Sequence, residues 1–235
     1  MPPNTHFSFK QFTIHQDRTA MKVTTDACIL GAYTSVQNAK KILDIGTGTG
    51  LLALMIAQRA KAQIDCVEIE AVAYHQAVHN VENSIFKEKI TIHHIDIQSF
   101  TSEGFYDLVV SNPPFFQNHL KAETEARTNA LHTDTLSFED LLSSVIRLLS
   151  STGTFVVLLP AYESSVLEKM ANQLGLFANK KLSIHHRKGS KILRIITTFG
   201  FRKTEIQSEQ LFIKNSDESY TTDFQELLRE YYLIF

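Results

Sequence analysis

A glycine cluster marks the first candidate site in the sequence. Gly46, Gly48 and Gly50 fall within five residues, between a short apolar run and the start of a helix pattern. Such a loop lets backbone amides approach a ligand closely, and a helix N-terminus adds partial positive charge that suits a carboxylate or phosphate. The dinucleotide pattern G-x-G-x-x-G would need glycine at the position of Leu51. The acid-x-G-x-G-x-G pattern that begins at Asp44 therefore disfavours nicotinamide binding.

Two further acids follow the next two expected strands. Glu68 lies at the end of the run 64–69, and Asp96 follows the run 90–95. A single acid at a strand end is commonly a helix cap or a solvated side chain. Carboxyl ends of parallel strands form one edge, and open α/β sheets bind their ligands there. The acids therefore predict a ligand site at this edge, where a carboxylate such as Glu68 suits the two hydroxyls of a ribose.

A proline-rich motif, Asn112-Pro113-Pro114-Phe115, follows the expected strand at 106–111. Asn-Pro commonly starts an ordinary turn. This loop, however, leaves the same sheet edge as the glycine cluster, and consecutive prolines make a stiff, extended backbone with free carbonyls. The position of the motif favours a role in binding or catalysis over a simple turn.

Together these motifs resemble those of class I S-adenosylmethionine-dependent methyltransferases, and 112–115 is similar to the Asn-Pro-Pro-Phe/Tyr signature of amino methyltransferases. The resemblance implies that the glycine loop lies against the methionine end of S-adenosylmethionine, with Asp44 near its ammonium group and Glu68 on its ribose. It also implies that Asp96 receives the adenine amine of the cofactor, with Ile97 beside the ring. Asn112 is expected to contact the cofactor as well.

The same resemblance assigns the motif a catalytic role. The exocyclic amine of a nucleobase is a poor nucleophile, because its lone pair is delocalised into the ring. The resemblance implies that the Asn112 side-chain oxygen and the Pro113 carbonyl accept its two hydrogens, on the stiff backbone of Pro113 and Pro114, while Phe115 stacks on the base. No strong general base is required, since the positive charge of the cofactor drives the transfer.

Further segments along the chain indicate a more specific family within this class. They are similar to bacterial valine-tRNA methyltransferases that modify the exocyclic amine of adenine 37, beside the anticodon, in the ranges 7–17, 20–32, 126–127, 132–134 and 220–235. The resemblance implies that Lys22 and Thr25 lie at the start of a helix whose amino end closes over the methionine moiety. A capped surface helix is the alternative for Lys22.

Other functions remain open for the same motifs. The substrate amine could belong to a guanine in ribosomal RNA or to a glutamine side chain of a release factor. An RNA-binding protein that keeps a methyltransferase fold without catalysis is an alternative of a different class. The intact glycine loop and the intact motif at 112–115 argue against such a loss of activity.

Charge is segregated along the chain although the formal net charge is only −2. Residues 180–203 hold eight Lys or Arg and no acid, whereas 205–235 hold seven acids against two bases. A basic stripe of this kind is compatible with an anionic partner, which the resemblance implies to be tRNA, and a solvated hairpin is the alternative. Arg187, Lys188 and Lys191, at the expected tip of a hairpin, are predicted to contact RNA phosphates, and Arg127 is a further candidate.

Strand patterns that alternate with helix patterns must position these residues. The strands are expected at 41–45, 64–69, 90–95, 106–111, 154–159, 180–186 and 192–201, and helices at 51–60, 71–83, 162–174, 221–232 and after Ser137, with a short outer strand at 7–14. With the resemblance, this order predicts an α/β, Rossmann-like class I methyltransferase fold. Its sheet is seven-stranded and mostly parallel, with a C-terminal antiparallel strand pair. We expect one methyltransferase domain over 1–235, in which 1–36 closes the cofactor site, 37–203 form the core and 204–235 form a C-terminal tail and helix.

Composition excludes several classes of protein. With 43% hydrophobic and 20% charged residues, the chain is neither disordered nor fibrous. It has no apolar run of membrane-spanning length and no signal-peptide pattern, so a cytoplasmic protein without a membrane partner is expected. A monomer is also expected. Cys28 and Cys66 are expected to be buried thiols. His75 and His79 have the spacing of zinc ligands, but Gln76 stands where the catalytic glutamate would be and no third ligand is apparent, so no metal is expected.

Overall fold

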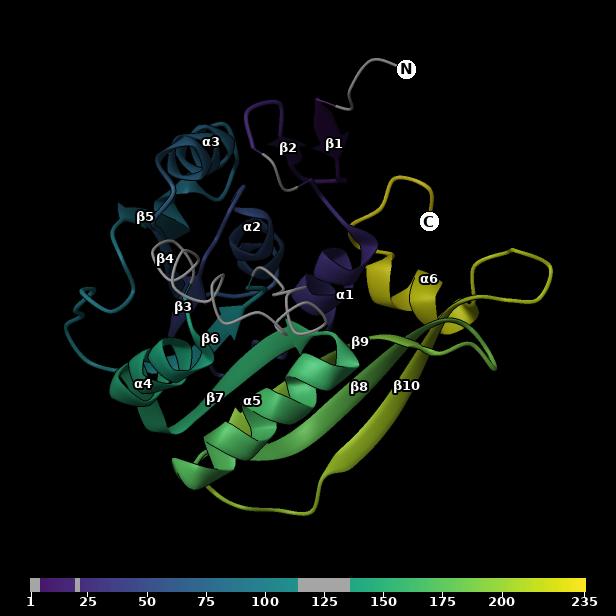
Figure 1. Cartoon of the computed structure of the whole chain (residues 1–235). Helices are drawn as coiled ribbons and strands as arrows, with labels where there is room; N and C mark the ends of the chain where they lie inside the picture. The colour runs from purple at the N-terminus through teal and green to yellow at the C-terminus, as the bar shows by residue number, and fades with distance from the viewer. Residues whose placement is uncertain (1–4, 20–21, 114–135) are drawn as a thin grey trace, which may run out of the picture.

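An eight-stranded sheet with helices on both faces dominates the computed structural model, which describes residues 5–19, 22–113 and 136–235 (Figure 1). The strand order is β10-β8-β9-β7-β6-β3-β4-β5. The strands are β3 (Lys41–Ile45), β4 (Gln63–Glu68), β5 (Ile90–His94), β6 (Tyr106–Ser111), β7 (Leu149–Leu159), β8 (Phe177–Arg187), β9 (Ile192–Gly200) and β10 (Gln207–Lys214). Within this sheet β9 pairs antiparallel with both β7 and β8, and the other neighbouring pairs are parallel.

The sheet confirms the predicted fold class, and it corrects the number of strands. The antiparallel pair at 180–186 and 192–201 is present as β8 and β9. The eighth strand, β10, lies in the segment expected to be a tail, and it pairs in parallel with β8. Its first four residues are exposed, and Leu211 is its one buried residue. An edge strand with so little apolar alternation gives no clear strand pattern, which explains why the sequence did not indicate it.

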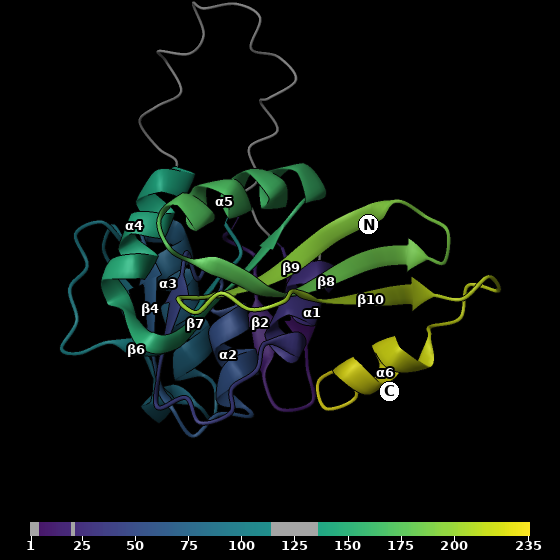
Figure 2. The same cartoon turned by 90° about the horizontal axis from the view of Figure 1, so that it is seen from below.

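Alternating residues of the central strands form two apolar layers. Ile42 and Leu108 pack in one cluster with α1 (Thr25–Tyr33), α2 (Leu51–Ala57) and α6 (Thr222–Leu228). The adjacent Leu43 and Val109 pack in the other cluster, with α4 (Phe138–Leu148) and α5 (Ala161–Gln173). Figure 2 shows α4 and α5 on one side of the sheet and α1, α2 and α6 on the other. The remaining helices are α3 (Ala71–Glu82) and the short η1 (Lys87–Lys89). Strands buried on both faces therefore carry the site.

The N-terminal segment is a small hairpin instead of the single strand expected at 7–14. Its strands are β1 (His6–Ser8) and β2 (Thr13–His15), and the Phe9 amide donates to the Phe12 carbonyl at 2.8 Å to close the turn. Phe9 and Phe12 are both buried, which breaks the alternation that a single strand would need. Phe9 also forms a β-bridge with Tyr232, so segments from the two ends of the chain pack together.

No helix in the described ranges combines the length and the apolar character that a membrane span requires.

Candidate active site

The predicted site residues follow four neighbouring strands at one edge of the sheet. Because β5, β4, β3 and β6 are adjacent and parallel, their carboxyl ends lead to Asp96, Glu68, Gly46 and Asn112 at that edge. The Ser111 hydroxyl donates to the carbonyl of Ile45 at 2.9 Å. This bond joins the end of β6 to the end of β3, so Asn112 is held beside the glycine loop.

The glycine loop turns sharply and leaves its outer side open. Gly46 and Gly48 have φ angles of +71° and +59°, in the left-handed region that favours glycine. A Cβ atom added at either position would meet no atom of the described residues within 4 Å. The Gly46 amide donates to the Val67 carbonyl at 2.9 Å, which fixes the loop against β4. The structure therefore provides backbone that a ligand can approach closely.

Asp44 lies beneath this loop with half of its carboxylate unsatisfied. Its side chain is fully buried, and Oδ2 accepts a hydrogen bond from the Thr47 hydroxyl at 2.6 Å. Oδ1 is buried and has no hydrogen-bond partner among the described residues. Burial raises the pKa of Asp44 to about 7, and the charge of Glu68 adds to the rise. A cationic ligand group beside Oδ1 would stabilise the ionised carboxylate, and so offset the cost of burying it and its repulsion from Glu68.

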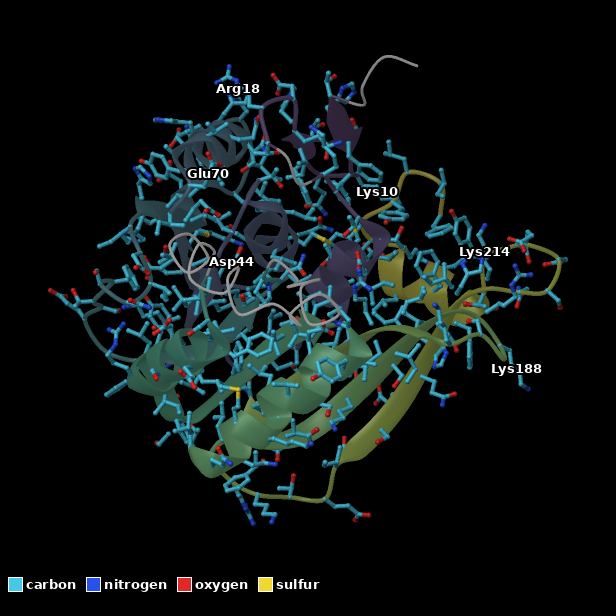
Figure 3. The ribbon with its side chains drawn as sticks, viewed as in Figure 1. Lys10, Arg18, Asp44, Glu70, Lys188 and Lys214 are labelled. Carbon is cyan, nitrogen blue, oxygen red and sulfur yellow. The ribbon has the colours of Figure 1, made fainter. Side chains whose placement is uncertain are left out.

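Glu68 connects the glycine loop to the start of α3. It is 8% exposed, Oε2 accepts from the Gly48 amide at 2.9 Å, and Oε1 accepts from the Glu70 amide at 2.9 Å. Glu70 in turn caps α3, with Oε2 accepting from the Ala73 amide at 2.6 Å (Figure 3 labels Asp44 and Glu70). Each oxygen of Glu68 keeps a second lone pair for a ligand hydroxyl. Glu68 thus shapes the loop, a role that the sequence did not predict.

Asp96 lies in a turn directly after β5. It is half-buried, and Oδ1 accepts from the Gln98 amide at 3.0 Å. The neighbouring Ile97 side chain is 4% exposed and packs into the cluster under α4, while its carbonyl accepts from Arg147 Nη2 at 2.9 Å. The side chain of Ile97 therefore anchors the turn, which holds Asp96 at the sheet edge.

Asn112 presents an unsatisfied acceptor at the end of β6. The residue is half-buried, and its Oδ1 atom is buried without a hydrogen-bond partner in the described ranges. Pro113, which follows it, is buried. The other predicted residues of this motif, Pro114 and Phe115, lie outside the described residues, as does Arg127.

The predicted closure of Lys22 and Thr25 over the methionine moiety stays a prediction, and the structure shows only where the two residues lie. The Lys22 ammonium donates to the carbonyls of Gln16 and, at 2.9 Å, Thr19, so its contacts are with the N-terminal segment. Thr25 is the exposed first residue of α1, and the cap of this helix is Thr24. No hydrogen bond between described residues joins either side chain to the glycine loop.

Buried carboxamides form a part of the site that sequence reasoning missed. Asn80 and Gln76, one turn apart on α3, are each 1% exposed. The Asn80 Nδ2 atom donates to the carbonyl of Thr49 in the glycine loop at 2.8 Å. The available signal was the presence of two amides on the helix face that also carries Ala73 and Ala77, both of them buried.

The basic stripe is partly neutralised by the acidic segment that follows it in sequence. Because β10 lies beside β8, Glu209 reaches Lys180, with a distance of 3.0 Å between Oε1 and Nζ. Glu218, in the loop after β10, pairs with Arg187 at 3.0 Å between Oε1 and Nη1. Charges that are separated along the chain are therefore adjacent in space.

Two lysines at the hairpin tip stay available. Lys188 and Lys191 are exposed, and neither has an ion pair within the part of the chain that the structure describes. Figure 3 shows Lys188 at the outer end of the β8–β9 hairpin. Since β8 runs in the same direction as β7 and β6, this tip belongs to the same end of the strands as Asn112.

The histidines of α3 and the two cysteines remain outside this site. His75 and His79 are exposed, and no group of three or more His, Cys, Asp or Glu residues that could hold a metal ion occurs among the described residues. Cys28 and Cys66 are fully buried free thiols, as predicted.

The glycine loop, the carboxylates and Asn112 at one edge of this sheet define the class as Rossmann-like class I methyltransferases. Among solved structures, the fold is similar to a predicted O-methyltransferase from Agrobacterium tumefaciens, with a TM-score of 0.66, 17% identity, and coverage of 87% of this chain and 96% of that chain. A methyltransferase from Pyrococcus furiosus has a TM-score of 0.60, 18% identity, and coverage of 82% and 90%.

Sequence comparison gives a closer relationship. The methyltransferase small domain family matches residues 25–158. Proteins named tRNA1(Val) (adenine(37)-N6)-methyltransferase are 44% identical in Dyadobacter fermentans, over 100% of both chains, and 43% identical in Phocaeicola vulgatus, over 98% of this chain and 99% of that one. The protein of the same name in Trichodesmium erythraeum is 44% identical over 97% of both chains. The chain belongs to this family of tRNA1(Val) (adenine(37)-N6)-methyltransferases.

Proposed function

We propose that the protein transfers a methyl group from S-adenosylmethionine to the exocyclic N6 amine of adenine 37 in a valine tRNA. The observation that carries the proposal is the Asn112 Oδ1 atom, a buried acceptor without a partner among the described residues. The Ser111–Ile45 hydrogen bond holds it beside the glycine loop. The names of the relatives support the choice of tRNA and of adenine 37.

The described residues fit the cofactor at separate points. The open backbone at Gly46 and Gly48 suits its methionine end, and the unpartnered Asp44 Oδ1 suits its ammonium group. Glu68 offers its remaining lone pairs to the ribose hydroxyls, and Asp96 offers an acceptor to the adenine amine. When bound, the cofactor supplies a methyl group on a positively charged sulfur.

Asn112 and Pro113 orient the substrate amine. With the Asn112 Oδ1 atom and the Pro113 carbonyl accepting its two hydrogens, the nitrogen is favoured in a more tetrahedral state, and its lone pair points along the line of transfer. Phe115 is proposed to stack on the target base. The methylated nitrogen then releases a proton to water, so no catalytic base is needed at this edge.

The exposed lysines at the hairpin tip are proposed to hold tRNA phosphates. Lys188 and Lys191 carry this role, and Arg187 joins them once it leaves Glu218. Arg127 is retained as a candidate RNA contact. One methyltransferase domain over 1–235 and a monomeric state are part of the same proposal. A cytoplasmic location is proposed as well, because the proposed substrate is tRNA.

An assay with defined RNA tests the proposal. The protein is incubated with methyl-labelled S-adenosylmethionine and an unmodified valine tRNA transcript, and the digested nucleosides are separated by mass spectrometry. We expect N6-methyladenosine from this transcript and none from a matched transcript with guanosine at position 37. Parallel incubations replace the tRNA with ribosomal RNA or with a release factor, and label in a ribosomal RNA guanosine or a release-factor glutamine would favour these alternative substrates. Binding of NAD without binding of S-adenosylmethionine would contradict the cofactor.

A further inference from the structure

Asn80 joins three segments of the protein through one buried side chain. Its Oδ1 atom accepts from the His15 amide at 2.9 Å, and Nδ2 donates to the carbonyls of His15 at 2.9 Å and Thr49 at 2.8 Å. Both protons of Nδ2 are therefore used, and the residue is only 1% exposed. The amide connects β2, α3 and the glycine loop.

The glycine loop needs such contacts because its glycines have no side chains to hold it. Glu68 fixes the loop at the Gly48 amide, and Asn80 fixes it one residue later, at the Thr49 carbonyl. Thr49 itself is 8% exposed, so its carbonyl cannot rely on water as a replacement partner. The two contacts together orient the Thr47–Gly48 peptide and the Thr49–Gly50 peptide of the loop.

The N-terminal segment gives Asn80 a firm support. The Lys10 amide, in the turn between β1 and β2, donates to the Tyr231 carbonyl at 2.9 Å, and the Lys10 ammonium donates to the Phe235 carbonyl at 2.9 Å. Farther along, the Arg18 amide donates to Gln76 Oε1 at 3.3 Å. The segment that contacts Asn80 is thus anchored on both sides of His15.

We propose that Asn80 is a positioning residue for the cofactor, because it transmits the placement of the N-terminal hairpin to the glycine loop. The inference rests on the proposed function, since it takes the glycine loop as the S-adenosylmethionine site. Asn80 does not touch the reacting atoms in this proposal. It acts through the Thr49 carbonyl, and it makes the N-terminal hairpin a structural part of the cofactor site.

The test compares Asn80→Ala with Tyr106→Phe. Each change removes buried hydrogen bonds, and Tyr106, whose hydroxyl donates to Asp65 Oδ2 at 2.8 Å, begins β6 at the opposite end of the strand from Asn112. Calorimetry with S-adenosylhomocysteine is done at a temperature where all variants are folded. We expect Asn80→Ala to weaken binding roughly 5- to 100-fold, as for buried groups left unpaired, and Tyr106→Phe to leave it within about twofold. The KM for tRNA should change little in either variant.

A second measurement uses the unmodified protein, so it does not depend on whether Asn80→Ala folds. Because coupling is reciprocal, S-adenosylhomocysteine should slow hydrogen exchange of the His15 amide, which donates to Asn80. Equal affinity for S-adenosylhomocysteine in Asn80→Ala and the wild type would overturn the positioning role. A hydrogen-exchange rate of the His15 amide that does not change when S-adenosylhomocysteine binds would also overturn it. If the wild type itself fails to bind S-adenosylhomocysteine, the proposed cofactor is wrong and the inference falls with it.

Discussion

The Gly48 amide donates to the Glu68 Oε2 atom at 2.9 Å, so the last residue of β4 holds the middle of the glycine loop. The other carboxylate oxygen accepts from the Glu70 amide. A carboxylate that was expected to serve only a ligand therefore also organises the backbone around that ligand. Loop shape and ligand recognition are coupled in one side chain.

Glu68→Gln should weaken cofactor binding by about 1.5 to 3 kcal/mol, because an amide can accept from one backbone N–H but opposes the other with its own NH₂ group. Calorimetry with S-adenosylmethionine measures the change. Glu70→Gln is the matched control, since Glu70 is exposed and caps α3. An unchanged dissociation constant for Glu68→Gln would contradict a role of Glu68 in binding the cofactor.

Asp44→Asn should stabilise the free protein increasingly as pH rises from about 4 to about 7. The pKa of Asp44 is raised to about 7, so the folded state binds this proton more tightly than the unfolded state does, and folding stability falls as the proton is lost. The asparagine avoids that cost and keeps an acceptor for Thr47. Thermal melts of both proteins at several pH values measure the difference in Tm.

In the wild type, cofactor affinity should rise with pH, whereas folding stability falls. Binding of a ligand ammonium favours ionised Asp44, so affinity should increase as pH rises through about 7 and binding near that pH should release a proton. Asp44→Asn should bind weakly without this dependence. A wild-type affinity that does not vary between pH 5.5 and pH 8 would argue against an ammonium partner for Asp44.

Asn112→Ala should slow methyl transfer by about 10² or more while cofactor affinity stays nearly intact, by analogy with the loss of a preorganised polar group that acts in the transition state. Single-turnover rates with valine tRNA and calorimetry separate the two effects. Asn112→Asp keeps an acceptor oxygen and should retain more activity than the alanine variant. Wild-type turnover in Asn112→Ala would exclude the amine-holding role.

Neutralising Lys188 and Lys191 should weaken tRNA binding. The salt slope, which is the steepness with which the logarithm of the binding constant falls against the logarithm of the salt concentration, should decrease by roughly 1.5, at about 0.7 to 0.9 per lost phosphate contact. Cofactor affinity should not change. Lys180 and Lys181 provide the control pair, because they already bind Glu209 and Glu168 at 3.0 and 2.7 Å. Equal tRNA affinity in the wild type and the Lys188→Gln/Lys191→Gln variant at low salt would place the docking surface elsewhere.

Glu218→Gln should strengthen tRNA binding, since it frees Arg187 from an exposed ion pair of 3.0 Å and removes a negative charge from the hairpin tip. The salt slope should steepen by about 0.7 to 0.9 if Arg187 gains one phosphate contact. Filter binding over a range of salt concentrations measures both. Unaltered affinity would show that Arg187 lies outside the RNA interface.

Local patterns along the chain were sufficient to predict the alternation of strands and helices and the sheet edge where the motifs gather. The strands at 41–45 and 106–111 have the predicted bounds, and the Ser137 cap of α4 is confirmed. These features follow from side-chain periodicity, capping residues and turn residues, which act over a few neighbouring positions. The family resemblance also depended on short motifs, and the comparisons confirm it.

Only the tertiary structure decided which partners these residues have. The sequence suggested a basic stripe and a separate acidic tail, but β10 returns beside β8 and brings Glu209 to Lys180. The sequence likewise gave no indication that Asn80 would hold the glycine loop, because His15 and Thr49 are distant in sequence from α3. Composition and spacing determine which groups are present, whereas their hydrogen bonds and ion pairs depend on long-range contacts that form only when the whole chain folds.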